Sequence, residues 1–181
     1  MINPPSGASE NIVYAARPTA MGPLVMAATA RGVCFAQFGE SGAELIAQLK
    51  SEFPDATHTP SRLTESHELE TWIEAFAAHI AGDAPRPGFA LDLRGSAFQI
   101  RAWRLLLQLP DGKMMSYAEL AAGIDAPKAV RAAASACAAN RIAVLVPCHR
   151  VLRGDGALGG YRWGLERKRT LIDRERARQS P

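Results

Sequence analysis

The 181-residue sequence has only three cysteines, Cys34, Cys137 and Cys148, and none belongs to a Cys-x-x-Cys pair. An odd number of cysteines without paired spacing argues against a disulfide framework and against a four-ligand zinc site. Three of the four histidines are scattered through the first half, with no cysteine at metal-ligand spacing. We therefore expect no metal site, and we interpret Cys34 and Cys137 as core residues.

The sequence also lacks any apolar run of about 18 residues, the length that a membrane-spanning helix needs. The first ten residues contain no basic segment followed by an apolar core, as a secretory signal would. We therefore expect a cytoplasmic protein that does not associate with membranes. The Pro-Pro-Ser-Gly run at residues 4–7 favours a mobile tail over residues 1–11.

Charge is unevenly distributed along the chain. Residues 1–93 contain 5 Lys and Arg against 11 Asp and Glu, a net charge of −6, whereas residues 94–181 contain 16 against 7, a net charge of +9. A basic half in a short chain is typical of a protein that binds the phosphate backbone of nucleic acid. A solvated basic surface would give the same composition, so charge alone leaves both alternatives open.

The first half begins with short apolar runs and then changes to helical spacing. The apolar runs and the turn residues between them predict a small antiparallel sheet, with strands over residues 12–15, 24–28 and 33–38. Apolar residues at helical spacing predict two helices, over 44–53 and 69–80. Glycines and prolines from Gly82 onward predict a linker. We expect an N-terminal α/β lobe over residues 12–93, linker included.

The second half, residues 94–181, is predicted to be mostly helical. Apolar spacing and charge favour a first and a last helix, over 98–109 and 165–178. Ser116 can cap a short helix that begins at Tyr117, and a proline suits the first turn of another helix over 127–139. Two helices joined by a tight turn suggest a helix-turn-helix unit.

The helix expected over 127–139 belongs to a segment rich in alanine, with eight alanines among the fourteen residues 126–139. Such a smooth surface can pack closely against a neighbouring helix, and one face must do so. Another face carries Arg131 and Ser135, which are adjacent at i, i+4 spacing. An arginine on an otherwise small face could point into a base stack, so DNA contact is the alternative to simple packing.

The candidate for chemistry is Cys148, in the run Pro147-Cys148-His149-Arg150-Val151. A buried cysteine is more often inert packing than a nucleophile. Here a proline fixes the backbone before the cysteine, and two basic residues follow it. A nearby cation lowers the pKa of a thiol, so we expect a reactive thiolate. Because neighbouring side chains diverge in an extended chain, we expect His149 to act through a water, oriented by a carboxylate elsewhere.

From the residues alone, a reactive thiol beside a basic surface fits two classes of protein. A Cys-His peptidase would carry the same pair of residue types. Peptidases, however, need an oxyanion hole and usually recruit their histidine from far along the chain. A basic helix-turn-helix also has no evident use in a peptidase. The residues alone therefore support a reactive thiol beside a basic surface, with a peptidase as the less favoured alternative.

An ordered set of motifs resembles the O6-alkylguanine-DNA alkyltransferases, the methylated-DNA–protein-cysteine methyltransferase family. The resemblance covers about residues 12 to 175 and is closest to the C-terminal half of the bacterial Ada-type proteins. The motifs that carry it occur in the family's order and spacing: Ser116-Tyr117, residues 126–132, Ala139-Asn140, Pro147–Val151 and Gly159-Gly160-Tyr161-Arg162-Trp163-Gly164.

The resemblance implies a mixed α+β fold: a ribonuclease-H-like α/β lobe followed by a helical lobe with a winged helix-turn-helix. It implies a monomer without cofactor or metal, whose recognition helix enters the minor groove of double-stranded DNA and whose target nucleotide rotates out. The minor groove carries little sequence information, which suits a search for damage in any sequence. Extrusion is needed because the alkyl carbon cannot meet a protein thiolate inside the base stack.

The resemblance also implies roles for individual residues. Cys148 is the nucleophile of one in-line displacement, His149 is its base through a bound water, and Glu175 orients His149. Tyr117 presses on the target phosphate and donates a proton toward the leaving guanine, and Arg131 fills the gap in the stack. The alternatives are that Tyr117 merely begins a helix, that Glu175 is one more surface charge, and that Arg131 contacts a phosphate.

Further residues complete the expected site. Asn140 ties the recognition helix to the cysteine loop, unless it is an ordinary helix end, and Tyr161 and Val151 wall the substrate pocket. Arg162 stands where some family members have a serine near the guanine oxygen, so backbone N–H groups are expected to donate there. The remaining DNA contacts are expected along the recognition helix, at Lys128, Ala129, Ala132 and Ser135.

We therefore predict a DNA repair methyltransferase that acts once, because a thioether is a poor leaving group and Cys148 keeps the alkyl group. O6-alkylguanine is the expected substrate, and the resemblance suggests O4-alkylthymine as another. A binding module that recognises damage without reacting is the competing class; its relatives carry tryptophan at the nucleophile position, so Cys148 argues against it. The chain has no counterpart of the zinc and regulatory domains of Ada, so no transcriptional role is expected.

Overall fold

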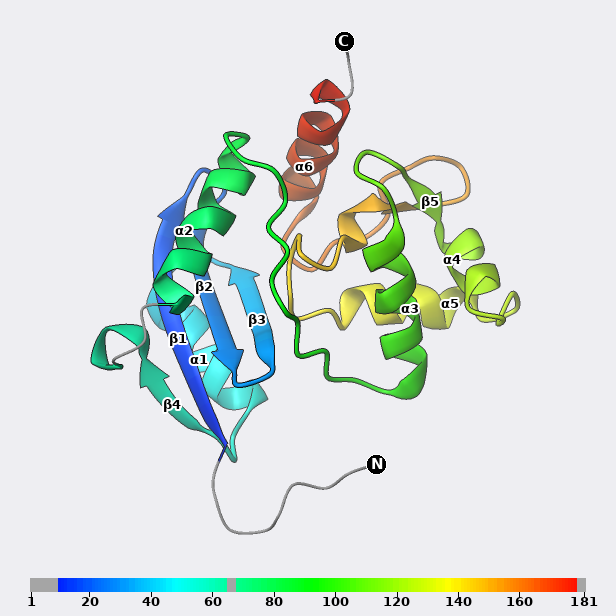
Figure 1. Cartoon of the computed structure of the whole chain (residues 1–181). Coiled ribbons are helices and arrows are strands. Elements are labelled where there is room, and N and C mark those ends of the chain that lie inside the picture. The colour runs from blue at the N-terminus through cyan, green and yellow to red at the C-terminus, as the bar shows by residue number, and fades with distance from the viewer. Residues whose placement is uncertain (1–9, 65–67, 179–181) are drawn as a thin grey trace.

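The computed structural model describes residues 10–64 and 68–178, and Figure 1 shows them arranged as two lobes side by side. The fold is a mixed α+β fold, as the sequence predicts. The tail expected over residues 1–11 lies outside the described residues except for its end, where Asn11 already begins a strand. No helix in the described ranges combines the length and the hydropathy that crossing a membrane would need.

The N-terminal lobe is built on a four-stranded sheet of order β3-β2-β1-β4. Its strands are β1 (Asn11–Thr19), β2 (Gly22–Thr29), β3 (Gly32–Phe38) and β4 (Thr57–Pro60). The first three are antiparallel, as predicted, and β4 pairs in parallel with β1. The sequence gives no sign of β4, because Thr57–Pro60 is polar and lacks alternating apolar residues.

Two helices cover the two faces of this sheet, α1 (Gly42–Glu52) and α2 (Glu68–Ala81). Leu45 and Leu49 of α1 join an apolar cluster with Phe35 on one face. Residues of α2 such as Ile73 and Phe76 join the larger cluster that fills the space between the lobes. Both helices lie within two residues of their predicted bounds.

The linker after α2 and a segment of the second lobe cover the free edge of β3. Val33 exchanges backbone hydrogen bonds with the linker at Ala90 and Asp92, and Ala36 exchanges them with Arg141 and Ala143. The backbones approach so closely that a Cβ on Gly32, whose φ is +130°, would lie 2.2 Å from the Ala90 carbonyl oxygen. The segment that leads to Cys148 is therefore anchored on the sheet.

The second lobe contains the helices α3 (Ala97–Gln108), α4 (Tyr117–Gly123), α5 (Val130–Ala138) and α6 (Leu165–Ala177). Capping boxes begin α3 at Ser96 and α4 at Ser116, as the sequence predicts for α4. The predicted start of α5 near Pro127 is wrong. Asp125 has a φ of +59°, and a tight turn over 126–129 delays the helix to Val130.

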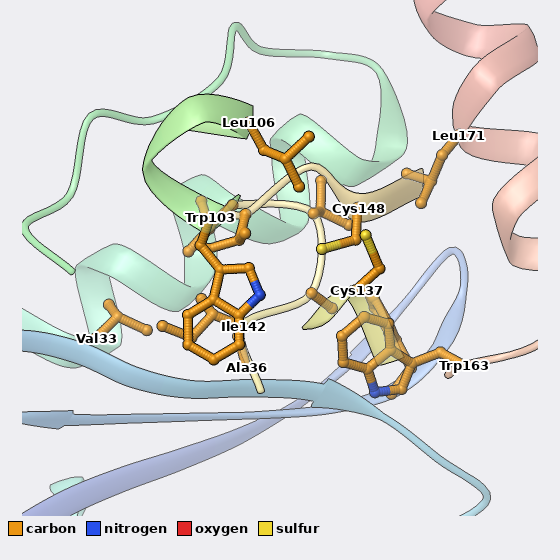
Figure 2. Close-up of a cluster of buried hydrophobic side chains, with 14 of the residues drawn as sticks. Val33, Ala36, Trp103, Leu106, Cys137, Ile142, Cys148, Trp163 and Leu171 are labelled. Carbon is orange, nitrogen blue, oxygen red and sulfur yellow. The ribbon is translucent and has the colours of Figure 1, made fainter. Parts of the chain in front are cut away.

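Two very short strands, β5 (Met115–Ser116) and β6 (Val151–Leu152), pair in parallel beside the helices α4 and α5. Figure 2 shows the apolar core between the lobes, in which Trp103 and Ile142 lie between the sheet and the cysteine loop. The Trp103 indole donates a hydrogen bond to the carbonyl of Ala136 at 2.9 Å. α3 and α5 are thereby fixed relative to each other beneath the cysteine loop.

Candidate active site

Cys148 begins a short 3-10 helix, η2 (Cys148–Arg150), directly after Pro147. Its backbone N–H donates to the carbonyl of Val146 at 2.8 Å, which closes a tight turn. The extended chain expected here is therefore wrong. Val144, two residues before Val146, has a φ of +65°. A β-branched residue adopts this left-handed conformation only under strain. The cysteine loop is thus held in a shape that its own sequence does not prefer.

Asn140 supports this turn from inside, and its side chain is almost completely buried. Its amide nitrogen donates to the carbonyls of Ile142 and Val146, at 3.2 and 3.1 Å, and its oxygen accepts from the Ile142 N–H at 2.8 Å. Because Asn140 directly follows α5, these bonds connect the end of that helix to the cysteine loop. This is the connection that the family resemblance implies.

Behind the turn, His149 and Arg150 converge on one carboxylate, that of Glu175 on α6. His149 Nε2 lies 2.7 Å from Glu175 Oε1, and Arg150 Nε lies 2.9 Å from Oε2. The Arg150 guanidinium also donates to the Leu109 carbonyl at 2.9 Å and to an Asp111 carboxylate oxygen at 2.6 Å. The structure thus brings together the histidine and the carboxylate that the sequence predicts as partners.

The burial of this cluster sets its protonation state. Burial opposes ionisation of Glu175, but the hydrogen bonds from His149 and Arg150 outweigh it and lower the pKa of the carboxyl to about 2. Burial lowers the pKa of His149 despite the opposing effect of Glu175. The neutral imidazole therefore donates Nε2–H to the carboxylate, which leaves Nδ1 with its lone pair. Nδ1 is buried and has no hydrogen-bond partner among the described residues.

The thiol of Cys148 differs from expectation, because burial raises its pKa well above the ordinary value. The expected effect of the two neighbouring cations is absent: His149 is neutral, and Arg150 is bound to carboxylates. A hydrogen bond with Asn140 and the charge of Lys168 oppose the increase without cancelling it. The resting cysteine is therefore a protonated thiol, which would have to lose its proton before its sulfur could act as a nucleophile.

Cys137 of α5 lies directly against Cys148, and Figure 2 shows the two sulfur atoms facing each other. Contact with Cys137 also raises the pKa of the Cys148 thiol. Cys34, in contrast, lies within the sheet of the first lobe. Both cysteines are buried, as the sequence predicts, but Cys137 belongs to the surroundings of the nucleophile.

Lys168 of α6 is a buried cation that the sequence analysis did not identify. Its ammonium group donates to the carbonyls of Val151 at 2.7 Å, Gly160 at 3.2 Å and Leu158. These carbonyls belong to the segment between the cysteine turn and α6, and desolvation lowers the pKa of the ammonium. Lys168 therefore fixes that segment and places a positive charge near the thiol.

A pocket of about 430 Å³ opens next to Cys137. Tyr117, at the start of α4, forms one wall, and the segment from Gly159 to Arg162 forms another. Gly159 has a φ of +64°, and a Cβ there would lie 3.1 Å from the Tyr117 hydroxyl, so glycine allows the two walls to approach. Burial raises the pKa of Tyr117 to about 12, so its hydroxyl keeps its proton at neutral pH.

Tyr161 forms the floor between this pocket and the buried cluster. Its ring meets His149 edge to face, with centroids 6.5 Å apart, and meets Trp163 in the same way at 5.1 Å. Its hydroxyl is buried without a hydrogen-bond partner among the described residues, and burial raises its pKa. Val151, the other expected wall residue, is buried in β6 beside the turn.

The residues expected to contact DNA lie on the outer side of α5 and of the turn before it. Arg131, Ala132 and Ser135 are exposed on the helix, and Ala133 and Ala136 form its buried face. Lys128 and Ala129 are also expected DNA contacts and precede α5. Lys128 is exposed, and Ala129 is the N-terminal cap residue of the helix. A smooth, alanine-rich face with an arginine in its first turn is thus open to a partner.

The Arg162 side chain extends away from the pocket toward the first lobe. It donates to a carboxylate oxygen of Glu52 at 2.6 Å and to the carbonyl of Asn140 at 3.2 Å. From the sequence, backbone N–H groups are expected to donate to the guanine oxygen at this position. With the guanidinium bound to Glu52, the backbone N–H groups of the segment are the groups there that can take this role.

Lys168 and Glu175 could have been found together from the sequence. They share a face of α6 with Leu171 and Ile172, at positions i, i+3, i+4 and i+7, and all four side chains are buried. Two charged residues on the same helix face as two apolar residues indicate that the charged side chains are buried as well. Glu52 and Cys137 have no such signal, because their contacts join segments that are far apart in the sequence.

Comparisons with known proteins agree with this geometry. Residues 97–177 match the family model described as the DNA binding domain of 6-O-methylguanine DNA methyltransferase. The bifunctional transcriptional activator/DNA repair enzyme Ada of Escherichia coli is 44% identical over 162 residues, which are 90% of this chain and 45% of that protein. The chain spans about half the length of the Ada proteins it matches.

Two further proteins match over most of their own length. The methylated-DNA--protein-cysteine methyltransferase of Mycolicibacterium paratuberculosis is 45% identical over 130 residues, which are 70% of this chain and 78% of that protein. The crystal structure of Mycobacterium tuberculosis OGT in complex with DNA superposes with a TM-score of 0.73 at 33% identity and covers 93% of this chain and 94% of that one. The chain therefore belongs to the methylated-DNA–protein-cysteine methyltransferase family.

Proposed function

We propose that this protein repairs DNA by moving the alkyl group of O6-alkylguanine onto Cys148 in a single irreversible step. The observation that carries the proposal is the arrangement around Cys148: a protonated thiol at a tight turn, with a neutral histidine and an ionised carboxylate behind it. A pocket large enough for a purine base is lined by Cys137, whose side chain contacts Cys148. These are the parts that attack on an alkyl carbon needs.

In the proposed reaction, the Cys148 sulfur forms a bond to the alkyl carbon as the bond from that carbon to the guanine O6 breaks. The thiol proton passes to Nδ1 of His149 through a bound water, and Glu175 stabilises the resulting imidazolium. The Tyr117 hydroxyl, which is protonated at neutral pH, donates a proton to the leaving guanine, and the resulting tyrosinate regains a proton from the His149 imidazolium through water. The products are an S-alkyl cysteine and an unmodified guanine. Because a thioether does not leave readily, each protein acts once.

We further propose that α4 and α5 act as a helix-turn-helix, with the β5–β6 pair as its wing, and that the four-stranded lobe is of the ribonuclease-H type. In this arrangement α5 enters the minor groove, where alanines allow close approach. Arg131, exposed in the first turn of α5, fills the space of the extruded nucleotide. The relative from Mycobacterium tuberculosis that superposes on this chain was crystallised with DNA, which supports a DNA partner.

The two other classes of function have less support. A thiol peptidase usually takes its histidine from far along the chain, whereas here the histidine directly follows the cysteine and its Nε2 is bound to Glu175. A module that only binds damage has no use for a buried His–Glu pair behind a cysteine. We propose that the protein works as a monomer in the cytoplasm, where its three free cysteines stay reduced.

Intact-mass analysis tests the proposal. The purified protein is mixed with a duplex that contains one O6-methylguanine, and peptide mapping then locates any added methyl group. One methyl per chain on Cys148, with loss of the lesion from the DNA, is the expected result. An unchanged mass after complete binding of the lesion would show a binding module instead. A Cys148→Ala variant that still clears the lesion would overturn the proposal.

A further inference from the structure

A polar bridge joins the two lobes behind the pocket. It begins in the pocket segment Gly159–Gly164, from which Arg162 reaches Glu52 at the end of α1, with 2.6 Å between guanidinium nitrogen and carboxylate oxygen. The next residue, Trp163, donates from its indole to the side-chain oxygen of Gln37 on β3 at 3.3 Å. Arg162, which lines the pocket, and the residue that follows it are thus both attached to the N-terminal lobe.

Glu52 is itself firmly held. The Arg141 guanidinium donates to its other carboxylate oxygen at 2.6 Å, and Gln48 donates to the oxygen that Arg162 uses, at 2.9 Å. The side chains of Glu52 and Arg162 are 14% and 26% exposed, so solvent screens this pair in part. A carboxylate in the last turn of a helix lies at the unfavourable end of the helix dipole. The two arginines compensate for this placement, and both come from the second lobe.

The bridge continues directly into the reaction centre. Trp163 packs edge to face on Tyr161, and Tyr161 packs edge to face on His149. Tyr161 and Arg162 both line the pocket. A displacement of the Arg162 backbone would therefore move the pocket wall and the ring that contacts the base.

We infer that Glu52 is a positioning residue of the alkyl-transfer site: through Arg162 it holds the pocket segment against the N-terminal lobe and so sets the width of the pocket. The inference rests on the proposed function and extends it to the first lobe, whose part in the reaction would otherwise be limited to supporting the fold. A tightly held wall favours a small alkyl group, and a released wall admits a larger one at the cost of precise placement.

The size dependence of transfer tests this inference. Single-turnover rates at saturating protein are measured on one duplex that carries either O6-methylguanine or O6-benzylguanine. In Glu52→Gln the methyl rate should fall, and the ratio of benzyl to methyl rates should rise about fivefold, a change typical of coupled neighbouring residues. Arg162→Gln should change the ratio equally, and the double variant should add nothing further, because both substitutions break the same contact.

Arg141→Gln is the matched control. It removes the other arginine of Glu52, and therefore weakens the contact between the lobes, but Arg141 is not part of the pocket. Its thermal stability should fall at least as much as that of Glu52→Gln, and its benzyl to methyl ratio should equal that of the wild type. If Arg141→Gln shifts the ratio as much as Glu52→Gln does, general loosening of the lobes explains the effect and the inference is wrong.

A ratio in Glu52→Gln equal to that of the wild type would also overturn the inference. If this variant does not fold, Arg162→Lys decides, because it keeps the charge but loses the second bond to Asn140. Its ratio should lie between those of the wild type and Arg162→Gln, and a wild-type ratio in both Arg162 variants would contradict the inference. A wild-type protein that transfers no methyl group to Cys148 would instead show that the proposed function is wrong.

Discussion

The two lobes bury polar groups in different ways. On the outer face of the N-terminal sheet, α1 covers an apolar cluster, and the polar side chain buried beside it, Gln37, is uncharged. The second lobe buries four ionisable side chains around a single turn of the chain, those of His149, Arg150, Lys168 and Glu175. Removing charges from water costs several kcal/mol each, and an apolar core of similar volume is often as stable or more so. The charged cluster therefore lowers the stability of the second lobe, and we attribute its presence to the proposed transfer chemistry.

Side chains in the two regions are therefore expected to contribute differently to stability and to reactivity. Side chains in the apolar cluster should affect the amount of folded protein and leave the reactivity of each folded molecule unchanged. Side chains in the charged cluster should affect both, because they hold the cysteine turn and, in the proposed reaction, supply its base. Substitutions in the two regions therefore test whether stability and reactivity can be changed separately.

The largest effect is expected from Glu175→Gln in the charged cluster. The amide cannot stabilise an imidazolium at His149, so the rate of methyl transfer at saturating protein should fall by about 10² to 10⁴, the usual contribution of a general base. Arg150 also loses a buried charged partner, so the free energy of unfolding should fall by about 3–5 kcal/mol. Single-turnover kinetics and urea unfolding measure the two effects.

Glu166→Gln is the control for this prediction, because Glu166 is an exposed carboxylate in the first turn of the same helix. Its transfer rate should equal that of the wild type. A Glu175→Gln variant that transfers methyl groups within a factor of about three of the wild-type rate would leave His149 without a role as base, since such catalysis contributes far more than that.

Phe35→Ala is the corresponding change in the apolar cluster. Phe35 is completely buried, and loss of its ring should lower the free energy of unfolding by about 3–5 kcal/mol. The rate of transfer per folded molecule should not change, because the cluster lies on the face of the sheet away from Cys148. Urea unfolding gives the stability, and the amplitude of methyl transfer gives the folded fraction. A slower rate at full amplitude would contradict the comparison.

The sequence predicts the regular elements well where their signals are local. The helical spacing of apolar residues fixes α1, α2, α3 and α6 to within two residues, and Ser116 with Glu119 marks the start of α4. The start of α5 is predicted three residues early, because a proline suits the first helical turn and equally suits the tight turn that is actually present. The polar edge strand β4 has no local signal at all.

For the site, the sequence predicts the identity of several residues but not the protonation state of the thiol or the contact between the lobes. Cys148, His149 and Glu175 follow from motifs and resemblance, and the structure places the last two in contact. The protonation state of Cys148 does not follow, because it depends on burial and on where the neighbouring charges point. The contact of Glu52 with Arg162 joins residues 110 positions apart. No local pattern encodes such a pair, and only the packing of the two lobes creates it.

A smaller effect is expected from Arg131→Ala on the exposed face of α5. Because Arg131 is exposed, its loss should leave the stability unchanged. If it fills the gap left by an extruded base, transfer from a lesion in duplex DNA should slow by about tenfold. Transfer from free O6-benzylguanine, which needs no extrusion, should keep its wild-type rate. Equal losses with both substrates would place Arg131 in the chemical step and contradict a role in extrusion.

The smallest effect concerns the pH dependence of stability. The pKa of Glu175 is lowered to about 2 in the folded protein, from an ordinary value of 4.5. A carboxyl with a lowered pKa stabilises the fold fully above its unfolded pKa, and this contribution is lost as the pH falls through the folded pKa. The difference in unfolding free energy between the wild type and Glu175→Gln should therefore be constant above about pH 5 and shrink steadily toward pH 2. Phe35→Ala removes no ionisable group, so its difference from the wild type should not vary over the same range. Urea unfolding at several pH values measures both, and a constant difference for Glu175→Gln would show that its carboxylate is not stabilised by His149 and Arg150.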